Sequence, residues 1–265
     1  GSGKTIVAVF ACLQAVENGF QTAIMAPTEI LANQHLHGFS DYLTPLGIQI
    51  AFLTGSQNSQ QRNEQLALVR SGAAQIVIGT HALFQEAVAF DNLGLVIIDE
   101  QHKFGVHQRL SLAQKARNTP HQLVMTATPI PRSLTMSAYA DLDSSIIDEL
   151  PPGRSPIQTV ALANDKKEKV LDKIRQVCHE GNQVYWVCTL IEESEVLRAQ
   201  SATDTQLYLT ENLPDLCIVL IHGRMNKQEK NDIMLRFSMG EVDVLVATTV
   251  IEVGVNVPNA SLMVI

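Results

Sequence analysis

The stretch Leu93-Gly94-Leu95-Val96-Ile97-Ile98-Asp99-Glu100 decides the fold class, because a continuous apolar run ends in two acidic residues. Apolar residues at nearly every position predict a strand at Leu95–Ile98 that is covered on both faces, as in a parallel sheet. Similar short runs recur in the first half of the chain, with helical patterns between them. They predict strands at Gln21–Ala26, Ile48–Leu53, Gln75–Gly79 and Gln122–Thr126. This alternation indicates an α/β fold with a mainly parallel sheet.

A second series of apolar runs predicts a second α/β lobe. Its strands are expected at Ile157–Ala161, Val184–Cys188, Cys217–His222, Val242–Ala247 and Leu262–Ile265. Helix starts are predicted where a capping residue stands three positions before a glutamate. This spacing occurs at Asp165 with Glu168 and at Asn226 with Glu229.

Residues 149–156, Glu-Leu-Pro-Pro-Gly-Arg-Ser-Pro, separate the two series. Prolines and a glycine at this density cannot continue a helix or a central strand. We therefore predict a linker between a first lobe at 1–150 and a second lobe at 151–265. A long loop inside one domain is the alternative.

Composition limits the class of protein. Hydrophobic residues make up 46% of the 265 residues and charged residues 17%, which excludes a disordered chain. No apolar run approaches the roughly 18 residues of a membrane-spanning helix, so we expect no contact with a membrane. The formal net charge of −8 argues against a broad basic surface for nucleic acid. It does not exclude a nucleic-acid motor, because backbone amides and a few placed side chains can hold phosphates.

The cysteines and histidines show no metal-binding pattern. The four cysteines form no CxxC pair, so we expect buried thiols in a reducing cytosol. His35 and His37 would project about 200° apart on a helix, which disfavours a shared metal ion. We interpret this pair as part of a solvated face.

The segment Gly1-Ser2-Gly3-Lys4-Thr5 matches the second half of a P-loop and precedes an apolar helical run. Small residues let backbone N–H groups surround phosphates at a helix N-terminus. All five residues are then candidates for binding ATP, with Lys4 at the β- and γ-phosphates and Thr5 at Mg²⁺. An ordinary helix N-terminus is the alternative.

The acidic pair after the apolar run supports the nucleotide site. Two carboxylates at a buried strand end are costly to desolvate unless they meet a cation. In a P-loop enzyme Asp99 would bind Mg²⁺, and Glu100 would orient or deprotonate the attacking water. The alternative, a strand that runs into a solvated turn, would explain either acid alone. It does not explain why the same lobe also contains a P-loop.

The order of the short motifs resembles the first lobe of a superfamily 2 helicase of the DExH type. These motifs are G-S-G-K-T, A-P-T-E at 26–29, G-T-H at 79–81, D-E-Q-H at 99–102 and T-A-T at 126–128. Longer strings at 99–109, 125–132, 138–143, 147–154 and 185–195 resemble the RecG family of branched-DNA helicases. The strings at 104–106 and 126–132 are shared with transcription-repair coupling factors. This resemblance implies two RecA-like lobes.

The resemblance also implies roles for individual residues. It places His102 and Gly254 at the nucleotide, and it assigns coupling of hydrolysis to lobe movement to Thr126, Ala127 and Thr128. DNA contacts are implied for Pro27, Thr28, Thr80, His81, His222, Gly223, Arg224, Thr248 and Thr249. Other interpretations remain: Thr28 is also a suitable N-cap for a helix, with Glu29 in its first turn. Arg224 could be a surface charge.

From these residues we expect the motor core of an ATP-dependent DNA helicase that remodels stalled forks and branched junctions. It would act as a cytoplasmic monomer with ATP and Mg²⁺. We also expect a fragment that alone is nearly inactive, because the first P-loop glycine, the family's wedge domain and its arginine motif are absent. Lys103 and Asn256 depart from the family pattern, which has Arg and Asp there. The alternatives are a translocase like the coupling factor and a non-catalytic nucleotide-binding module.

Overall fold

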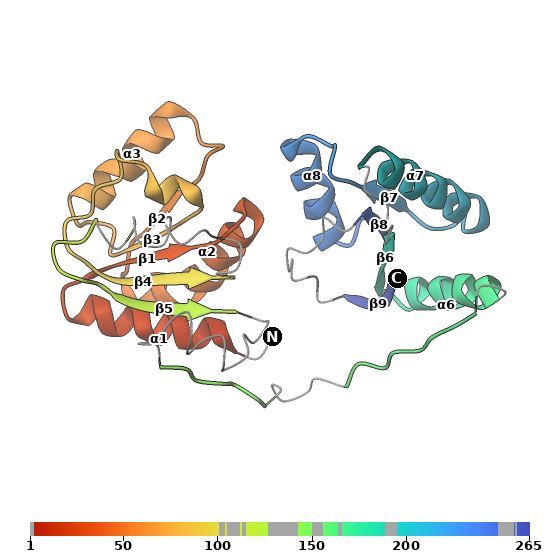
Figure 1. The fold of residues 1–265 in the computed structure, drawn as a ribbon, viewed down its shortest axis with the longest axis horizontal. Coiled ribbons are helices and arrows are strands. Elements are labelled where there is room, and N and C mark those ends of the chain that lie inside the picture. Colours follow the sequence, from red (N-terminus) through yellow and green to blue (C-terminus); the bar gives the residue numbers. More distant parts are fainter. Residues whose placement is uncertain are drawn as a thin grey trace. The chain divides into compact units, whose positions relative to one another are not determined.

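The computed structural model describes residues 3–100, 104, 112, 115–126, 143–149, 156–163, 166–188, 195–248, 257 and 259–265. The chain divides into two compact units, Gly1–Pro156 and Ile157–Ile265 (Figure 1). Each unit has its own sheet, and each is described by itself.

The first unit is built on a five-stranded parallel sheet with the strand order β2-β3-β1-β4-β5. Its strands are β1 (Gln21–Met25), β2 (Ile50–Leu53), β3 (Ile76–Gly79), β4 (Leu93–Asp99) and β5 (His121–Met125). The five strands expected from the apolar runs are all present, with ends that differ by one or two residues. The central strand β1 is buried along its whole length, which explains its lack of polar alternation.

Helices precede and connect these strands. They are α1 (Lys4–Glu17), α2 (Glu29–Leu43) and α3 (Ser59–Arg70), with short 3₁₀ turns η1 (Thr44–Leu46) and η2 (His81–Phe84). α2 begins where the sequence predicts an N-cap, because Oγ1 of Thr28 accepts a hydrogen bond from the backbone N–H of Leu31 at 3.4 Å.

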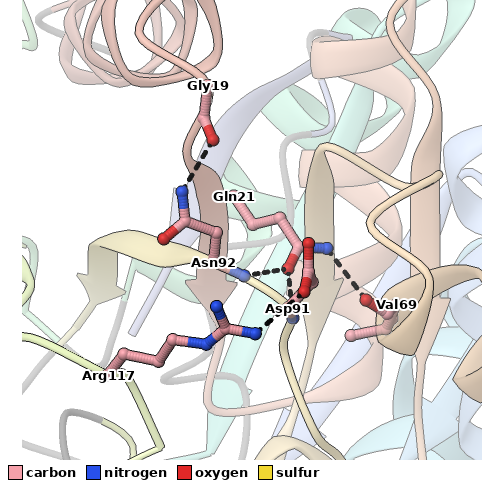
Figure 2. Close-up of polar contacts among 6 residues, drawn as sticks. All are labelled: Gly19, Gln21, Val69, Asp91, Asn92 and Arg117. Atoms are coloured by element: carbon pink, nitrogen blue, oxygen red, sulfur yellow. Dashed lines mark hydrogen bonds and ion pairs between the residues drawn. The ribbon is translucent and has the colours of Figure 1, made fainter.

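Gln21 joins the end of α3 and the loops before β3 and β4 to the start of β1; Figure 2 shows its contacts with Val69, Asp91 and Asn92. Its side chain is 4% exposed, and its Nε2 donates to the carbonyls of Val69 at 3.0 Å and Ala74 at 2.8 Å. Its Oε1 accepts from the backbone N–H groups of Asp91 at 2.8 Å and Asn92 at 3.1 Å. One amide thereby binds four backbone groups at the amino edge of the sheet, of which the carbonyls of Val69 and Ala74 are buried.

The second unit is a four-stranded parallel sheet in the order β7-β8-β6-β9. Its strands are β6 (Gln183–Cys188), β7 (Ile218–Ile221), β8 (Val244–Thr248) and β9 (Ala260–Val264). The helices are α6 (Lys167–His179), α7 (Glu195–Asn212) and α8 (Lys227–Ser238). The predicted fold class, two parallel α/β sheets flanked by helices, is confirmed.

One predicted strand of the second unit is wrong. The segment Ile157–Ala161 is not a strand, and the side chains of Ile157 and Val160 are 83% and 73% exposed. Its β-branched residues favour an extended backbone, but a strand forms only where a neighbouring strand accepts its hydrogen bonds.

Gln183 repeats the arrangement of Gln21 in the second sheet. It begins β6, and its Nε2 donates to the carbonyls of Phe237 and Val242, both at 2.6 Å. Each glutamine also follows a glycine with positive φ by two positions, Gly19 in the first unit and Gly181 in the second. The two sheets therefore begin with the same pair of donor contacts, but they differ at the amide oxygen: Oε1 of Gln21 accepts two hydrogen bonds, whereas Oε1 of Gln183 is buried without a partner among the described residues.

The two predicted capping boxes differ in outcome. Asn226 caps α8 and exchanges both hydrogen bonds with Glu229, so that box is confirmed. α6 begins one residue after Lys166, which makes no side-chain cap, and Asp165 lies outside the described residues. The four cysteines are free: Cys12 and Cys178 are buried, and the other two are half-buried. Within the described part of the chain, no helix has both the length and the apolar character to cross a membrane.

Candidate functional site

The carboxyl ends of the first sheet's strands gather the polar residues singled out in the sequence. Because all five strands are parallel, Thr28 after β1, Thr80 after β3, Asp99 at the end of β4 and Thr126 after β5 lie at one edge. Backbone hydrogen bonds join neighbours along this edge, for example from Glu100 to the carbonyl of Met125 at 3.0 Å. Ligands of α/β sheets commonly bind at such an edge.

The N-terminus of α1 lies on the side of the first sheet towards which β4 and β5 point (Figure 1). Gly3 is its N-cap and has a φ of 89°, a left-handed conformation that glycine adopts without strain. Lys4 is half-buried and Thr5 is exposed. The first backbone N–H groups of a helix lack intrahelical partners, so this end of α1 can bind an anion.

Asp99 is held at both carboxylate oxygens. Oδ2 lies 2.8 Å from Nε2 of His35 on α2, and Oδ1 accepts from the backbone N–H of Glu100 at 3.0 Å. The residue is 9% exposed. A buried, hydrogen-bonded carboxylate at a strand end is a suitable ligand for a hard cation such as Mg²⁺.

The expectation that the His35–His37 pair forms a solvated face is wrong for His35. His35 is 8% exposed and faces the sheet, whereas His37 is exposed. The angle of about 200° between them on a helix places them on opposite sides of α2. Only one of the two could face solvent, and the packing of α2 selects His37.

Glu100 connects the ends of β4 and β5. Its φ of 50° is positive, which is uncommon for a residue with a side chain. Its Oε2 lies 3.5 Å from the hydroxyl of Thr126, at the outer limit of a hydrogen bond. The turn therefore brings the candidate catalytic carboxylate next to the candidate coupling threonine.

Sequence reasoning missed the role of Glu29 within the site. Its Oε1 accepts hydrogen bonds from the hydroxyl of Thr54, at 3.2 Å, and from that of Ser56. These residues follow β2, so Glu29 attaches the loop after β2 to the start of α2. Its position in the first turn of a helix indicates only an interaction with the helix dipole.

His81 packs on aromatic side chains at the same edge. Its ring centroid lies 6.0 Å from that of Phe84 and 5.3 Å from that of Phe104. Phe104 is buried and follows the acidic pair by four positions. A candidate DNA residue therefore touches the segment that carries Asp99 and Glu100.

The second unit repeats the gathering of residues at its own carboxyl edge. His222, Gly223 and Arg224 follow β7, and Thr248 ends β8. Lys230 donates to the carbonyl of Gly223 at 2.7 Å and closes this turn, while Arg224 is exposed. Gly223 and Arg224 are exposed to solvent, so this turn can contact a ligand.

Several candidates cannot be placed. Those that lie outside the described residues are Gly1, Ser2, His102, Lys103, Ala127, Thr128, Thr249, Gly254 and Asn256.

Two family models match the chain. Residues 1–137 match the DEAD/DEAH box helicase family, and residues 165–265 match the helicase conserved C-terminal domain.

Relatives and a solved structure agree with these matches. The chain is 57% identical to an ATP-dependent DNA helicase RecG of Haemophilus influenzae and 56% identical to that of Escherichia coli K12. Both matches cover all of this chain and 39% of the relative, so the chain spans about two fifths of the relatives' length. The structure of RecG bound to a three-way DNA junction matches with a TM-score of 0.81 and 43% identity. That match covers 100% of this chain and 34% of the other.

Proposed function

The chain belongs to the DEAD/DEAH box helicase family, and from that premise we propose that it is the motor core of an ATP-dependent DNA helicase. The substrates we propose are stalled forks and branched junctions. Relatives named RecG that are similar over the whole chain support this, as does the similar structure bound to a three-way junction. The organisms of these relatives support a place in the bacterial cytosol or nucleoid.

We propose that ATP binds at the N-terminus of α1, where Gly1, Ser2, Gly3, Lys4 and Thr5 would surround its phosphates. The hydroxyl of Thr5 and the carboxylate of Asp99 are hard oxygen donors, which fit Mg²⁺. The metal would neutralise charge that develops on the phosphates. His102 and Gly254 would complete the nucleotide contacts.

Glu100 would act on the attacking water. Its carboxylate lies one residue beyond Asp99 and next to the Thr126 hydroxyl. Hydrolysis at the phosphates could therefore alter the conformation of the turn after β5 through this contact. We propose that this turn, Thr126, Ala127 and Thr128, couples hydrolysis to movement of the lobes.

DNA would lie along strand ends of both units. Pro27, Thr28, Thr80 and His81 would hold its backbone in the first unit, and His222, Gly223, Arg224, Thr248 and Thr249 would do so in the second. Phosphate contacts of this kind position a protein on DNA without reading sequence. Each phosphate contact releases counterions, so binding should weaken as salt rises. The formal net charge of −8 supplies no long-range attraction to DNA.

One observation supports the nucleotide site most directly: the acidic pair Asp99-Glu100 lies at the end of β4, on the side of the first sheet where α1 begins. The first prediction therefore concerns Lys4. In a protein of the relatives' full length, Lys4→Ala should abolish Mg²⁺-dependent binding of a fluorescent ATP analogue, together with hydrolysis, because the ammonium group would contact only phosphates.

Lys169→Ala is the matched control, because Lys169 is exposed on α6. Binding of the analogue by Lys4→Ala at wild-type affinity would contradict the P-loop assignment. Binding by the wild type without hydrolysis in the presence of forked DNA would favour the non-catalytic module.

A further inference from the structure

His35 has no part in the proposed chemistry, yet it contacts the proposed metal ligand directly. It lies on α2, is 8% exposed, and its Nε2 is 2.8 Å from Oδ2 of Asp99. A carboxylate can only accept hydrogen bonds, so the imidazole is the donor. The two residues are 64 positions apart in the chain, so tertiary packing brings them together.

The two hydrogen bonds of Asp99 differ in what they constrain. The bond from the Glu100 N–H to Oδ1 comes from the next residue and moves with the turn. The bond from His35 comes from another element, so it fixes the direction in which the carboxylate points. Each carboxylate oxygen has a second lone pair, which remains available to a metal ion.

The position of His35 is itself well defined. α2 starts at a fixed cap, where Thr28 accepts from Leu31. One turn beyond His35, its ring meets the buried Phe39 edge-on, with centroids 6.0 Å apart and an interplanar angle of 77°. Packing of this kind restricts the rotamer of the imidazole.

We propose that His35 is a positioning residue that orients the Asp99 carboxylate for Mg²⁺. The inference rests on the proposed function, in which Asp99 binds the metal. Partners that orient a ligating side chain typically change metal affinity about 10- to 100-fold when they are removed. His35 would therefore act on magnesium affinity and leave direct nucleotide contacts unchanged.

A purely structural role predicts a different pattern. In that case His35 only donates a hydrogen bond to a buried carboxylate. Its loss then lowers the stability of the first unit without a specific effect on the affinity for Mg²⁺. Measurements of metal dependence and of stability on the same variants separate the two roles.

The experiment compares His35→Ala, His35→Gln and His37→Ala in the 265-residue chain. Binding of a fluorescent ADP analogue is titrated with MgCl₂ and is also measured in EDTA. We expect His35→Ala to raise the half-saturating Mg²⁺ concentration about tenfold or more, with unchanged affinity in EDTA. His35→Gln should lie closer to the wild type, because its Nε2 can donate from a similar position. His37→Ala should behave as the wild type, because His37 is exposed on the opposite side of α2.

Urea unfolding of each variant gives the stability. If His35→Ala lowers stability and leaves the Mg²⁺ titration unchanged, the positioning role is overturned. Asp99→Asn tests the premise separately. If that variant also leaves the Mg²⁺ titration unchanged, the proposed metal site fails; if it alone changes the titration, only the role of His35 fails.

Discussion

At the scale of single residues, the turn after β4 concentrates the candidate chemistry. Asp99 is buried and held by two hydrogen bonds, whereas Glu100 is half-buried and adopts a positive φ. Adjacent carboxylates thus have different surroundings, which suits one for binding a cation and the other for acting on water. The Thr126 hydroxyl lies next to the Glu100 carboxylate, so Thr126 can move when the contacts of that carboxylate change.

The proposed role of Glu100 predicts a separation of binding from hydrolysis. In a protein of the relatives' full length, Glu100→Gln should lower the rate of ATP hydrolysis about 100-fold or more, because an amide cannot accept the proton of the attacking water. Nucleotide affinity should be retained, because Glu100 would not contact the phosphates. Single-turnover hydrolysis with forked DNA and titration with a fluorescent ATP analogue measure the two quantities. Glu17→Gln, at an exposed position, is the control, and wild-type hydrolysis by Glu100→Gln would contradict the assignment.

Cys12 predicts a dependence of stability on pH. Burial raises the pKa of this thiol from 9.0 to about 12. Above pH 9 the unfolded chain loses this proton while the folded chain keeps it, so the thiol's contribution to stability falls as pH rises towards 12. The slope from this group approaches about 1.4 kcal/mol per pH unit. Urea unfolding at pH 8 and pH 10 should show a smaller loss in Cys12→Ala, and equal losses in both proteins would refute the prediction.

At the scale of elements, close approach between strands explains the glycine of the G-T-H motif, Gly79. Gly79 ends β3 beside β2, and a Cβ atom there would clash with the carbonyl oxygen of Leu53 and lie 3.1 Å from the Leu83 side chain. The glycine of the G-T-H motif is therefore required by the sheet. The following residues, Thr80 and His81, then emerge at the carboxyl edge.

Gly79→Ala should lower the free energy of unfolding by about 1–3 kcal/mol, because the backbone of β2 must move to admit the methyl group. Gly55→Ala is the matched control: Gly55 follows β2, and a Cβ atom there meets nothing within 4 Å. Thermal or urea unfolding checks the difference. Equal stability of the two variants would mean that the sheet accommodates the methyl group without cost.

α2 is the element that connects several parts of the proposed site. Thr28 caps its start, Glu29 in its first turn holds the loop after β2, and His35 reaches Asp99 from its buried side. A single helix therefore places a candidate DNA contact, a loop anchor and a partner of the proposed metal ligand. A shift of α2 would change all three together.

At the scale of the whole molecule, two units each carry their own sheet and core, and in each a buried glutamine at the start of a strand donates to two backbone carbonyls. A unit with its own core is expected to unfold cooperatively. The chain has one tryptophan, Trp186 in β6, so its fluorescence reports on the second unit.

Gln183→Leu should therefore lower the midpoint of the fluorescence transition, and Gln21→Leu should leave it in place while lowering the stability of the first unit. Each substitution leaves buried backbone groups without hydrogen-bond partners, and each such group lowers the free energy of unfolding by about 1–3 kcal/mol. Urea unfolding followed by fluorescence and by circular dichroism measures both effects. A shift of the fluorescence midpoint by Gln21→Leu would show that the two units unfold together.

The sequence by itself determined the features that depend on neighbours along the chain. Continuous apolar runs predicted nine of the strands, the Asn226–Glu229 spacing predicted a capping box, and Thr28 predicted the start of α2. The half P-loop and the acidic pair also indicated the kind of site. These signals are local, because periodicity, capping and turn chemistry act within a few residues.

Only the tertiary structure decided which distant residues meet. The pairing of His35 with Asp99, the contact of Glu29 with Thr54 and the four bonds of Gln21 depend on how α2 and the loops pack on the sheet. The segment Ile157–Ala161 shows the reverse case, because β-branched residues favour an extended backbone but cannot supply a partner strand. The hydrophobic pattern of the sequence indicates which side chains must be buried. Packing between elements far apart in the sequence decides which residues bury them.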